Sequence, residues 1–511
     1  MNRILIAVAA VLVLVAGGVL AAPEFIDWNR YRGAISAQVE QIVGHPVIIA
    51  GDIDFAVLPH PALSASGVHI VNPDEATAAD LASVAAIEIR VAFLPLLRGD
   101  VQVRQVILVN PVVELEILPS GQPNWSLVGV DGAEGASTFA AGLAQGLSFD
   151  SFITQNATVT FRDPANGIVE TFDAVNAEVT ADSVAGPFYA DGAFTVRGIP
   201  LAFNLATGDF GLGRPAALRI DMTNPESGDL AGFTGAWENQ TDSKKLTGTL
   251  RVEGADFAGT LRDFFRAWGT VPPKTPGLGV AFSVQTKTVW TPGEFGFNDI
   301  NAKLGEITGT GAVNMATGPS PRFDGTLAIS RGDLDALLAR AATDAPSVEA
   351  VLGIRPTFSV PQGLTGSLVV GVEAVSYNGR SARRIDMAAD VANGVIGISR
   401  ASALLPGVTE ITAAGTVRPA DGLAQFDGDV TGRSDNLRDL MGWLGQDFPD
   451  IPADRLRTLA FEGKLRARRD LLQAYGFDLR FDTTRVSGAA AYAFRERPAF
   501  SIDIAVDRVD L

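Results

Sequence analysis

Cysteine is absent from the 511-residue chain, and histidine occurs only as His45, His60 and His69. Without cysteine the fold has no disulfide framework and no thiolate chemistry. Three histidines outside any H-E-x-x-H spacing do not predict a zinc site, and no P-loop or G-x-S-x-G elbow occurs. The sequence therefore predicts no cofactor, no metal site and no catalytic residue, and we expect a protein that is not an enzyme.

Positive charge is also scarce, because 40 lysines and arginines face 58 aspartates and glutamates, for a net charge of -18. Binding to phosphate backbones requires a concentrated basic surface, so no nucleic-acid partner is expected. The acidic balance also disfavours flat docking onto an anionic leaflet. What the chain has in quantity is apolar residues, at 47%, and 54 glycines. This mixture is typical of many short strands joined by turns.

The first apolar run covers residues 4–22, which carry no charge and follow Arg3. Nineteen helical residues span about 30 Å, the thickness of a bilayer core. The alternative is a cleaved signal peptide ending near Ala22, but its apolar region would have only about 7 to 15 residues. We therefore expect a transmembrane anchor over residues 1–25, and either reading exports the rest. Representative lipid-facing anchor residues are Ile4, Leu12, Leu14 and Leu20.

A helix is predicted directly after the anchor, where apolar residues from Trp28 to Ile42 recur at helical spacing. Asp27 is the expected N-cap, and Gly44 ends the pattern. We assign residues 26–127 to this helix and a first block of strands. Residues 128–146, rich in glycine and alanine, are read as a linker or long loop, and residues 147–511 as a repeating β region.

Alternation of apolar and polar residues dominates the strands at both ends of the chain, so each strand has one apolar and one polar face. The fold class is mainly β: an elongated antiparallel sheet forming a groove. The alternative is that apolar faces pair into stacked sandwiches, which would bury the same residues. The expected groove-lining residues are Ile87, Ile89, Val91, Val101, Val103, Phe461, Phe477, Leu479, Phe481, Ile502 and Ile504.

A weak internal repeat places a helix after a glycine-containing strand. Phe257, Leu334 and Leu437 each lie nine positions after a strand glycine and open a helical pattern. Short amphipathic helices are thus predicted near residues 256–268, 333–341 and 435–445. A fourth copy has Ile502 at the glycine position and Leu511 nine residues later, where the sequence stops. From this we expect the 511 residues to be a fragment of a longer protein.

Several motifs in the first quarter carry a family resemblance. They are the segments 26–31, 46–54, 58–63, 68–70, 93–101, 109–115 and 124–125, with sequences such as Phe-Leu-Pro-Leu-Leu-Arg-Gly-Asp-Val and Asn-Trp. These motifs, after an apolar N-terminal helix, resemble the AsmA family of bacterial envelope proteins. The remaining three quarters resemble the family only in their repeats of strands and short helices.

The resemblance implies a single-pass protein of a Gram-negative inner membrane with its bulk in the periplasm. It further implies a β-groove that moves phospholipids between the membranes and contributes to outer-membrane biogenesis. Expected partners are phospholipids, the inner membrane through the N-terminal helix, and outer-membrane or periplasmic envelope proteins. The alternative function is a non-enzymatic scaffold or regulator of outer-membrane protein assembly, with exposed sheet edges accepting strands.

Overall fold

A computed structural model describes most of the chain after residue 26: residues 27–57, 60–96, 98, 102–125, 151–165, 167–181, 186–209, 214–240, 243–272, 275, 277–318, 320–344, 360–446, 448–452, 455–494 and 497–507. The expected anchor, with Ile4, Leu12, Leu14 and Leu20, lies outside these residues, as does the linker predicted at 128–146. Among the helices that are described, none combines the length and the hydropathy required of a membrane span.

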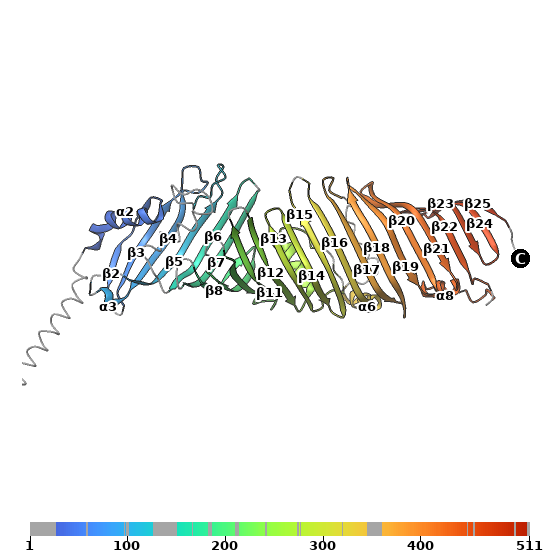
Figure 1. The fold of residues 1–511 in the computed structure, drawn as a ribbon, viewed down its shortest axis with the longest axis horizontal. Coiled ribbons are helices and arrows are strands. Elements are labelled where there is room, and N and C mark those ends of the chain that lie inside the picture. The colour runs from blue at the N-terminus through green and yellow to red at the C-terminus, as the bar shows by residue number, and fades with distance from the viewer. Residues whose placement is uncertain are drawn as a thin grey trace, which may run out of the picture. The chain divides into compact units, whose positions relative to one another are not determined.

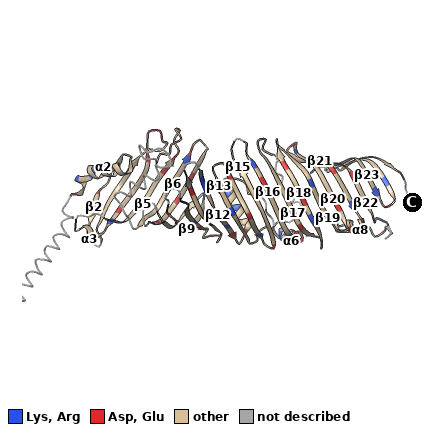
Figure 2. Ribbon diagram, viewed as in Figure 1, with Lys and Arg blue, Asp and Glu red and all other residues tan. Residues whose placement is uncertain are grey.

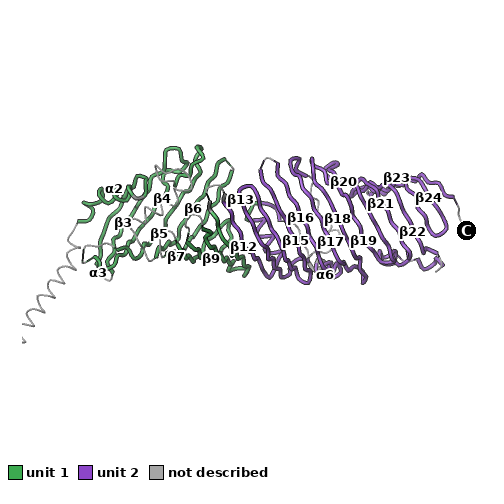
Figure 3. Tube along the Cα trace, viewed as in Figure 1, with its two compact units in different colours: residues 1–242, 267–269 green, residues 243–266, 270–511 purple. Residues whose placement is uncertain are grey.

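The described chain is mainly β, with 25 strands and few helices (Figure 1). It divides into two compact units, residues 1–242 with 267–269, and residues 243–266 with 270–511 (Figure 3). The elements of unit 1 are η2 Trp28–Tyr31, α2 Arg32–Val43, β1 Val47–Ile49, β2 Ile53–Ala56, β3 Ala62–Val71, β4 Asp80–Val91, α3 Phe93–Leu96, β5 Val103–Glu116, β6 Ser151–Asp163, β7 Ile168–Ala181, β8 Phe188–Val196, β9 Ile199–Thr207, β10 Ala216–Thr223 and β11 Leu230–Gln240.

The described part of unit 2 contains the other strands and three helices, the first of which ends in a residue counted with unit 1. Its elements are β12 Ser243–Gly254, α5 Phe257–Ala267, β13 Phe282–Thr291, β14 Glu294–Leu304, β15 Ile307–Ala316, β16 Arg322–Asp333, α6 Leu334–Asp344, β17 Thr365–Tyr377, β18 Arg380–Ala392, β19 Val395–Leu405, β20 Thr409–Ala420, β21 Leu423–Ser434, α8 Leu437–Trp443, β22 Leu459–Arg468, β23 Leu471–Phe481, β24 Thr484–Ala493 and β25 Ala499–Val506.

The sheet is mixed, which corrects the expectation of a purely antiparallel one. Strand β5 pairs in parallel with β6, and β16 pairs in parallel with β17. Parallel neighbours require a connection of about a dozen residues or more to return the chain to the starting edge. Residues 117–150 and 334–364 supply such connections. The other pairings described between consecutive strands from β3 onward are antiparallel, as in β7 with β8 and β23 with β24.

Two-residue turns fix the register of several hairpins. Asn378-Gly379 joins β17 to β18, and Asn393-Gly394 joins β18 to β19. Both residues of each turn have positive φ, at 48° and 70° in the first and 52° and 73° in the second. This geometry, which asparagine and glycine tolerate, matches the twist of the flanking strands and fixes their pairing next to the turn.

The N-terminal helix ends at the predicted glycine, but its start lacks the predicted side-chain cap. Gly44 takes a left-handed conformation with φ of 74° and stops α2. Asp27, however, makes no side-chain capping bond to the helix and instead pairs with Arg30 at 3.2 Å, which corrects the N-cap expectation. Trp28 and Ile35 pack on a buried cluster of β-strand residues, Ile49, Ile53 and Ala65, together with Leu63, Val68 and Ile87.

The helices of unit 2 are fixed to strand ends. Phe257 of α5 packs on Phe282, the first residue of β13, with ring centroids 5.4 Å apart. Asp335 of α6 accepts hydrogen bonds from the backbone N–H groups of Asn378 and Gly379 at 2.8 and 3.1 Å. Trp443 of α8 donates its indole N–H to the Tyr377 carbonyl at 2.7 Å. These bonds hold the β17–β18 turn against two helices.

A buried polar network closes the first block of strands. Asn124 is 1% exposed; its Oδ1 accepts the Glu116 backbone N–H at 2.9 Å, and its Nδ2 donates to the Glu114 carbonyl at 2.7 Å and to Asn72 Oδ1 at 2.9 Å. Glu116, 3% exposed, accepts both the N–H and the hydroxyl of Thr77 at 2.8 and 2.7 Å. The network ties the loop before β4 to the segment after β5.

We predict that Asn124→Ala destabilises unit 1 by about 2–4 kcal/mol, because it leaves three buried hydrogen-bonding groups without their partner. Native-state hydrogen exchange of β4 and β5 amides measures this loss locally. Asn204→Ala, on the exposed surface of β9, is the matched control and should change stability by less than about 0.5 kcal/mol. Equal effects of the two variants would contradict the structural role of the network.

Candidate functional site

One face of unit 1 is apolar across nine consecutive strands. Residues paired directly across a sheet lie on the same face, so the register can be followed from strand to strand. From β3 to β11 it connects Leu63, Ile89, Val106, Phe152, Val179, Ala190, Leu205, Ile220 and Phe233. Nine strands at a spacing of about 4.8 Å make this line roughly 40 Å long. We call this side the apolar face of unit 1.

The opposite side of the same strands is polar. One residue away from the apolar line on each strand, the register connects Glu178, Asp191, Asn204 and Asp221 across β7 to β10. Along these two lines, carboxylates and an amide lie on one side of the layer, and apolar residues lie on the other. Three phenylalanines of the apolar face, Phe172, Phe194 and Phe203, stack with centroid distances of 5.6 and 5.7 Å.

Unit 2 repeats this separation over fourteen strands. From β12 to β25 the register connects Leu246, Trp290, Phe295, Met315, Phe323, Gly366, Val391, Ile396, Val417, Phe426, Ala467, Leu472, Tyr492 and Phe500. No charged residue interrupts this line, which is roughly 60 Å long at about 4.8 Å per strand. We call this side the apolar face of unit 2.

The polar face of unit 2 is equally continuous. Its register connects Arg251, Gln285, Asn301, Thr310, Ala328, Gly371, Asp386, Ser402, Thr412, Thr431, Glu462, Asp478, Ser487 and Ala505. Ion pairs cross the strands here, including Lys464 with Asp429 at 3.1 Å and Arg466 with Asp427 at 2.8 Å. Basic and acidic positions are interspersed along the strands (Figure 2).

The apolar face of unit 2 remains accessible. Phe295, Met315, Leu472 and Tyr492 expose 38%, 46%, 42% and 40% of their surface, and Phe500 exposes 75%. The described strands belong to one sheet, so no second sheet of described residues stacks on this face. A closed sandwich would have buried these side chains. Of the two arrangements compatible with the periodicity, the described part of the chain therefore has the open one.

The structure places the sequence-predicted residues unevenly. Ile87 and Ile89 lie on the apolar face of unit 1, where Ile87 packs against the cluster under α2. Val91 and Val103 are paired but only 9% and 5% exposed, and Val101 lies outside the described residues. The other six lie on the apolar face of unit 2, where Phe477 is 8% exposed: Phe461, Phe477, Leu479, Phe481, Ile502 and Ile504.

Most of the apolar line was missed by sequence reasoning, which named no residue between β5 and β22. Trp290, Phe295 and Met315 are examples, since glycines and irregular steps obscure the alternation around them. For β17 to β19, the signal that could have found the apolar line is the pair of tight turns, because Asn-Gly at 378–379 and 393–394 fixes which residues of these strands face each other.

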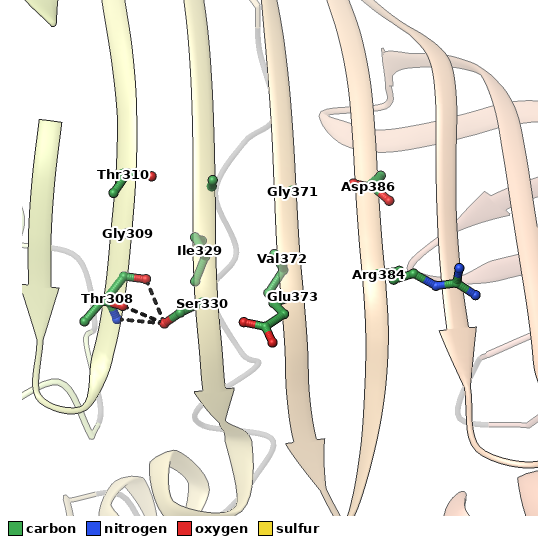
Figure 4. A pocket seen from close by; sticks show the side chains of 11 residues that line it. Thr308, Gly309, Thr310, Ile329, Ser330, Gly371, Val372, Glu373, Arg384 and Asp386 are labelled. Carbon is green, nitrogen blue, oxygen red and sulfur yellow. Dashed lines mark hydrogen bonds between the residues drawn. The ribbon is translucent and has the colours of Figure 1, made fainter. Parts of the chain in front are cut away.

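The cavities of unit 2 lie among polar-face side chains. One of about 440 Å³ is bordered by Thr308, Ser330, Glu373, Arg384 and Asp386 (Figure 4). The hydroxyls of Thr308 and Ser330 bond each other at 2.7 Å and not a base that would activate them. Within the described residues no group of three or more His, Asp or Glu side chains is arranged to hold a metal. The geometry assembles no catalytic constellation in this cavity.

In unit 2 the shifted pKa values belong to residues of the polar face and of turns. A hydrogen bond from the Tyr475 hydroxyl, reinforced by Arg466, lowers the pKa of Asp427. Asp482, in the turn after β23, is partly desolvated, which alone would raise its pKa. Three backbone N–H groups, from Leu456, Arg457 and Thr458 at 2.7, 2.9 and 2.9 Å, outweigh this and lower the pKa of Asp482.

Comparison with known proteins confirms the family resemblance. The family model of the AsmA family matches residues 1–252, so this part of the chain, from the N-terminus into β12, belongs to the AsmA family. The match extends well past the first quarter in which the motifs were recognised. No curated protein matches the chain.

Close packing of an aromatic residue is predicted to require glycine at some positions of the apolar face. A Cβ added at Gly463 would lie 2.7 Å from Phe477 Cβ and 2.9 Å from its Cα, so Gly463→Ala should destabilise the β22–β23 region by about 1–3 kcal/mol. Gly432→Ala, on the same face of β21, meets nothing within 4 Å and serves as the control. Hydrogen exchange of β22 and β23 amides distinguishes them, and a harmless Gly463→Ala would refute the close packing.

The lowered pKa of Asp482 predicts a pH-dependent contribution to stability. The ionised carboxylate stabilises the fold fully above its unfolded pKa of about 3.9, and this contribution disappears as pH falls through the lower folded pKa. Asp482→Asn should therefore cost roughly 1 kcal/mol at pH 7, discounted for partial solvent exposure, and little at pH 2. Denaturant titrations of both proteins at several pH values test this. Asp503→Asn on exposed β25 is the control, and a pH-independent loss in Asp482→Asn would contradict the assignment.

Proposed function

We propose that the chain binds phospholipid acyl chains along its apolar faces and passes them between the inner and outer membranes of a Gram-negative envelope. In this proposal the N-terminal apolar segment anchors the protein in the inner membrane, and the sheet lies in the periplasm. The protein contributes to outer-membrane biogenesis as a conduit, and no catalytic step is assigned to it.

A single observation carries the proposal: the uncharged line of apolar residues that crosses fourteen strands of unit 2 and stays accessible. Soluble proteins seldom leave large contiguous apolar surfaces exposed, and such surfaces mark binding sites. The counterpart line in unit 1 has the same character over nine strands. Membership of the N-terminal half in the AsmA family supports a role in the envelope.

The energetics suit transfer better than tight binding at one position. Burying an acyl chain gains about 0.8 kcal/mol per CH₂ wherever the surface is apolar. Because Phe295, Met315, Phe323 and their neighbours offer similar surfaces strand after strand, a lipid gains as much at one strand as at the next. Movement along the face therefore crosses no large free-energy well, while the charged headgroup stays in water.

A second candidate function rests on the edge strand β25. Within the described residues it pairs only with β24, and all eight of its residues are exposed. Unpaired strand edges accept strands from partner proteins. A scaffold for outer-membrane protein assembly would use this edge, and it does not require lipid on the apolar face.

Charge introduced on the apolar face is predicted to expel lipid. Met315→Asp and Leu327→Asp place carboxylates on β15 and β16, where Met315 and Leu327 expose 46% and 36% of their surface. Covering an ionised carboxylate with an acyl chain costs more than about 1.4 kcal/mol, the free energy that corresponds to a factor of ten. The yield of phospholipid photocrosslinked at Phe295 should therefore fall at least tenfold. Mass spectrometry of copurified and crosslinked lipid provides the measurement.

The neighbouring residues give matched controls. Asn314→Asp and Ala328→Asp add the same charge to the same strands on the polar face, and lipid yield should be unchanged. Equal lipid yields from the apolar-face variants and their controls would overturn the conduit proposal. Copurification of β-barrel assembly factors that depends on β25 and not on Met315 or Leu327 would then favour the scaffold.

A further inference from the structure

A short apolar projection lies at one rim of unit 1. Helix α3, Phe93–Leu96, follows the end of β4, and Leu94 is 71% exposed, more than any other large apolar side chain recorded for the described part of unit 1. Phe93 beside it is 41% exposed. Two adjacent large apolar residues held out in water are unfavourable unless another phase or molecule covers them.

The same rim receives the chain from its N-terminal apolar run. Trp28 packs on Phe55, near the end of β2, with ring centroids 5.3 Å apart. The Val91 N–H, two residues before α3, donates to the Pro61 carbonyl at 2.9 Å, just before β3 begins. The end of β2, the start of β3 and α3 therefore share one rim, and Figure 1 shows α3 beside β2.

Chain length limits how far this rim can lie from a bilayer. Only four residues, 23–26, separate Ala22 from Asp27, where the described structure begins, so the chain advances by five residues from one to the other. Fully extended, five residues reach about 17 Å. If residues 4–22 span the membrane, the first turn of described structure, and with it the rim of Trp28 and α3, is held close to the lipid headgroups.

We propose that α3 inserts Phe93 and Leu94 into the headgroup–acyl boundary of the inner-membrane leaflet from which the anchor emerges. The occupant is a phospholipid bilayer, because the anchored rim faces one and because both exposed side chains are apolar. Insertion is driven by apolar burial and not by attraction to anionic lipids, since the chain carries a net charge of -18.

This docking rests on the proposed function and gives it a starting point. Ile89, near the end of β4 on the apolar face of unit 1, lies four residues before Phe93, the first residue of α3, at the same rim. Trp28, Ile35 of α2, Leu63 and Ile87 already pack around the buried cluster of Ile49, Ile53 and Ala65. A lipid leaving the bilayer beside α3 would therefore meet the apolar face at β4–β5 without passing under the helix.

The absence of cysteine allows a direct test with the full chain in vesicles of phosphatidylethanolamine and phosphatidylglycerol. Leu94→Cys carries an environment-sensitive fluorophore, and lipids with a nitroxide near the headgroup act as quenchers. The control is Val169→Cys, which is 56% exposed at the opposite rim, near the start of β7 in the same unit. Quenching at position 94 should exceed that at 169 at least threefold. Equal quenching, or protection of position 94 from aqueous iodide without lipid quenching, would overturn the insertion, the latter in favour of a protein contact.

A second variant separates docking from transport. Phe93→Asp with Leu94→Asp should leave the anchored protein in the membrane and its hydrogen exchange in β4–β5 unchanged, but reduce lipid crosslinked at Ile89 at least threefold. Undiminished crosslinking would contradict α3 as the place where lipid is taken up. If position 94 is quenched while no lipid crosslinks at either apolar face, the docking stands and the conduit proposal fails. If lipid occupies the faces without quenching at 94, the conduit stands and the docking fails.

Discussion

The hydrogen-bond register is the constraint on which the two-faced sheet depends. Side chains alternate strictly along a strand, so slipping one strand by a single residue would turn its apolar side chains into water and its charged ones onto the apolar face. In unit 2 the register keeps Phe323 beside Met315 and Gly366, and Asp386 beside Gly371 and Ser402. Tight turns such as Asn378-Gly379 enforce this pairing locally, and ion pairs on the polar face penalise any slip.

Bulges would break this separation if they were not compensated. Five register shifts coincide with residues of positive φ, namely Asn156, Ala174, Asp299, Arg384 and Gly476. Each left-handed residue absorbs one extra position, so the strand resumes with the same face inward. Phe297 and Ile300 show the effect, since they lie three residues apart and yet both pair with apolar-face residues of β15. The left-handed backbone costs local conformational strain, but it keeps the apolar residues on one side along the whole strand.

These bulges also limit how much of the two-faced sheet could be predicted from the sequence. Alternation identified the strands at both ends, where Ile87, Phe461 and Ile504 fall on apolar faces, and the glycine spacing anticipated where helices α5, α6 and α8 begin. In the middle, a step of three residues at each bulge interrupts the period-two pattern, so no face could be assigned there. Parallel pairing of β5 with β6 depends on contacts between distant segments, which local periodicity does not encode. The burial of Val91 and Val103 likewise arises from tertiary packing.

A sheet with one accessible apolar face lacks the source of stability that a closed core provides. Its buried apolar residues are few, and several of them are alanines, such as Ala157, Ala190 and Ala389. Cross-strand pairs and backbone ladders must therefore supply most of the stability, strand by strand, which favours local over global opening. A ligand that covers the apolar face adds the missing burial and, by mass action, stabilises the strands it touches. If lipid binds as proposed, the strands that expose Met315 and Phe500 gain stability from it, and the separation of apolar and charged residues decides which side of the sheet binds.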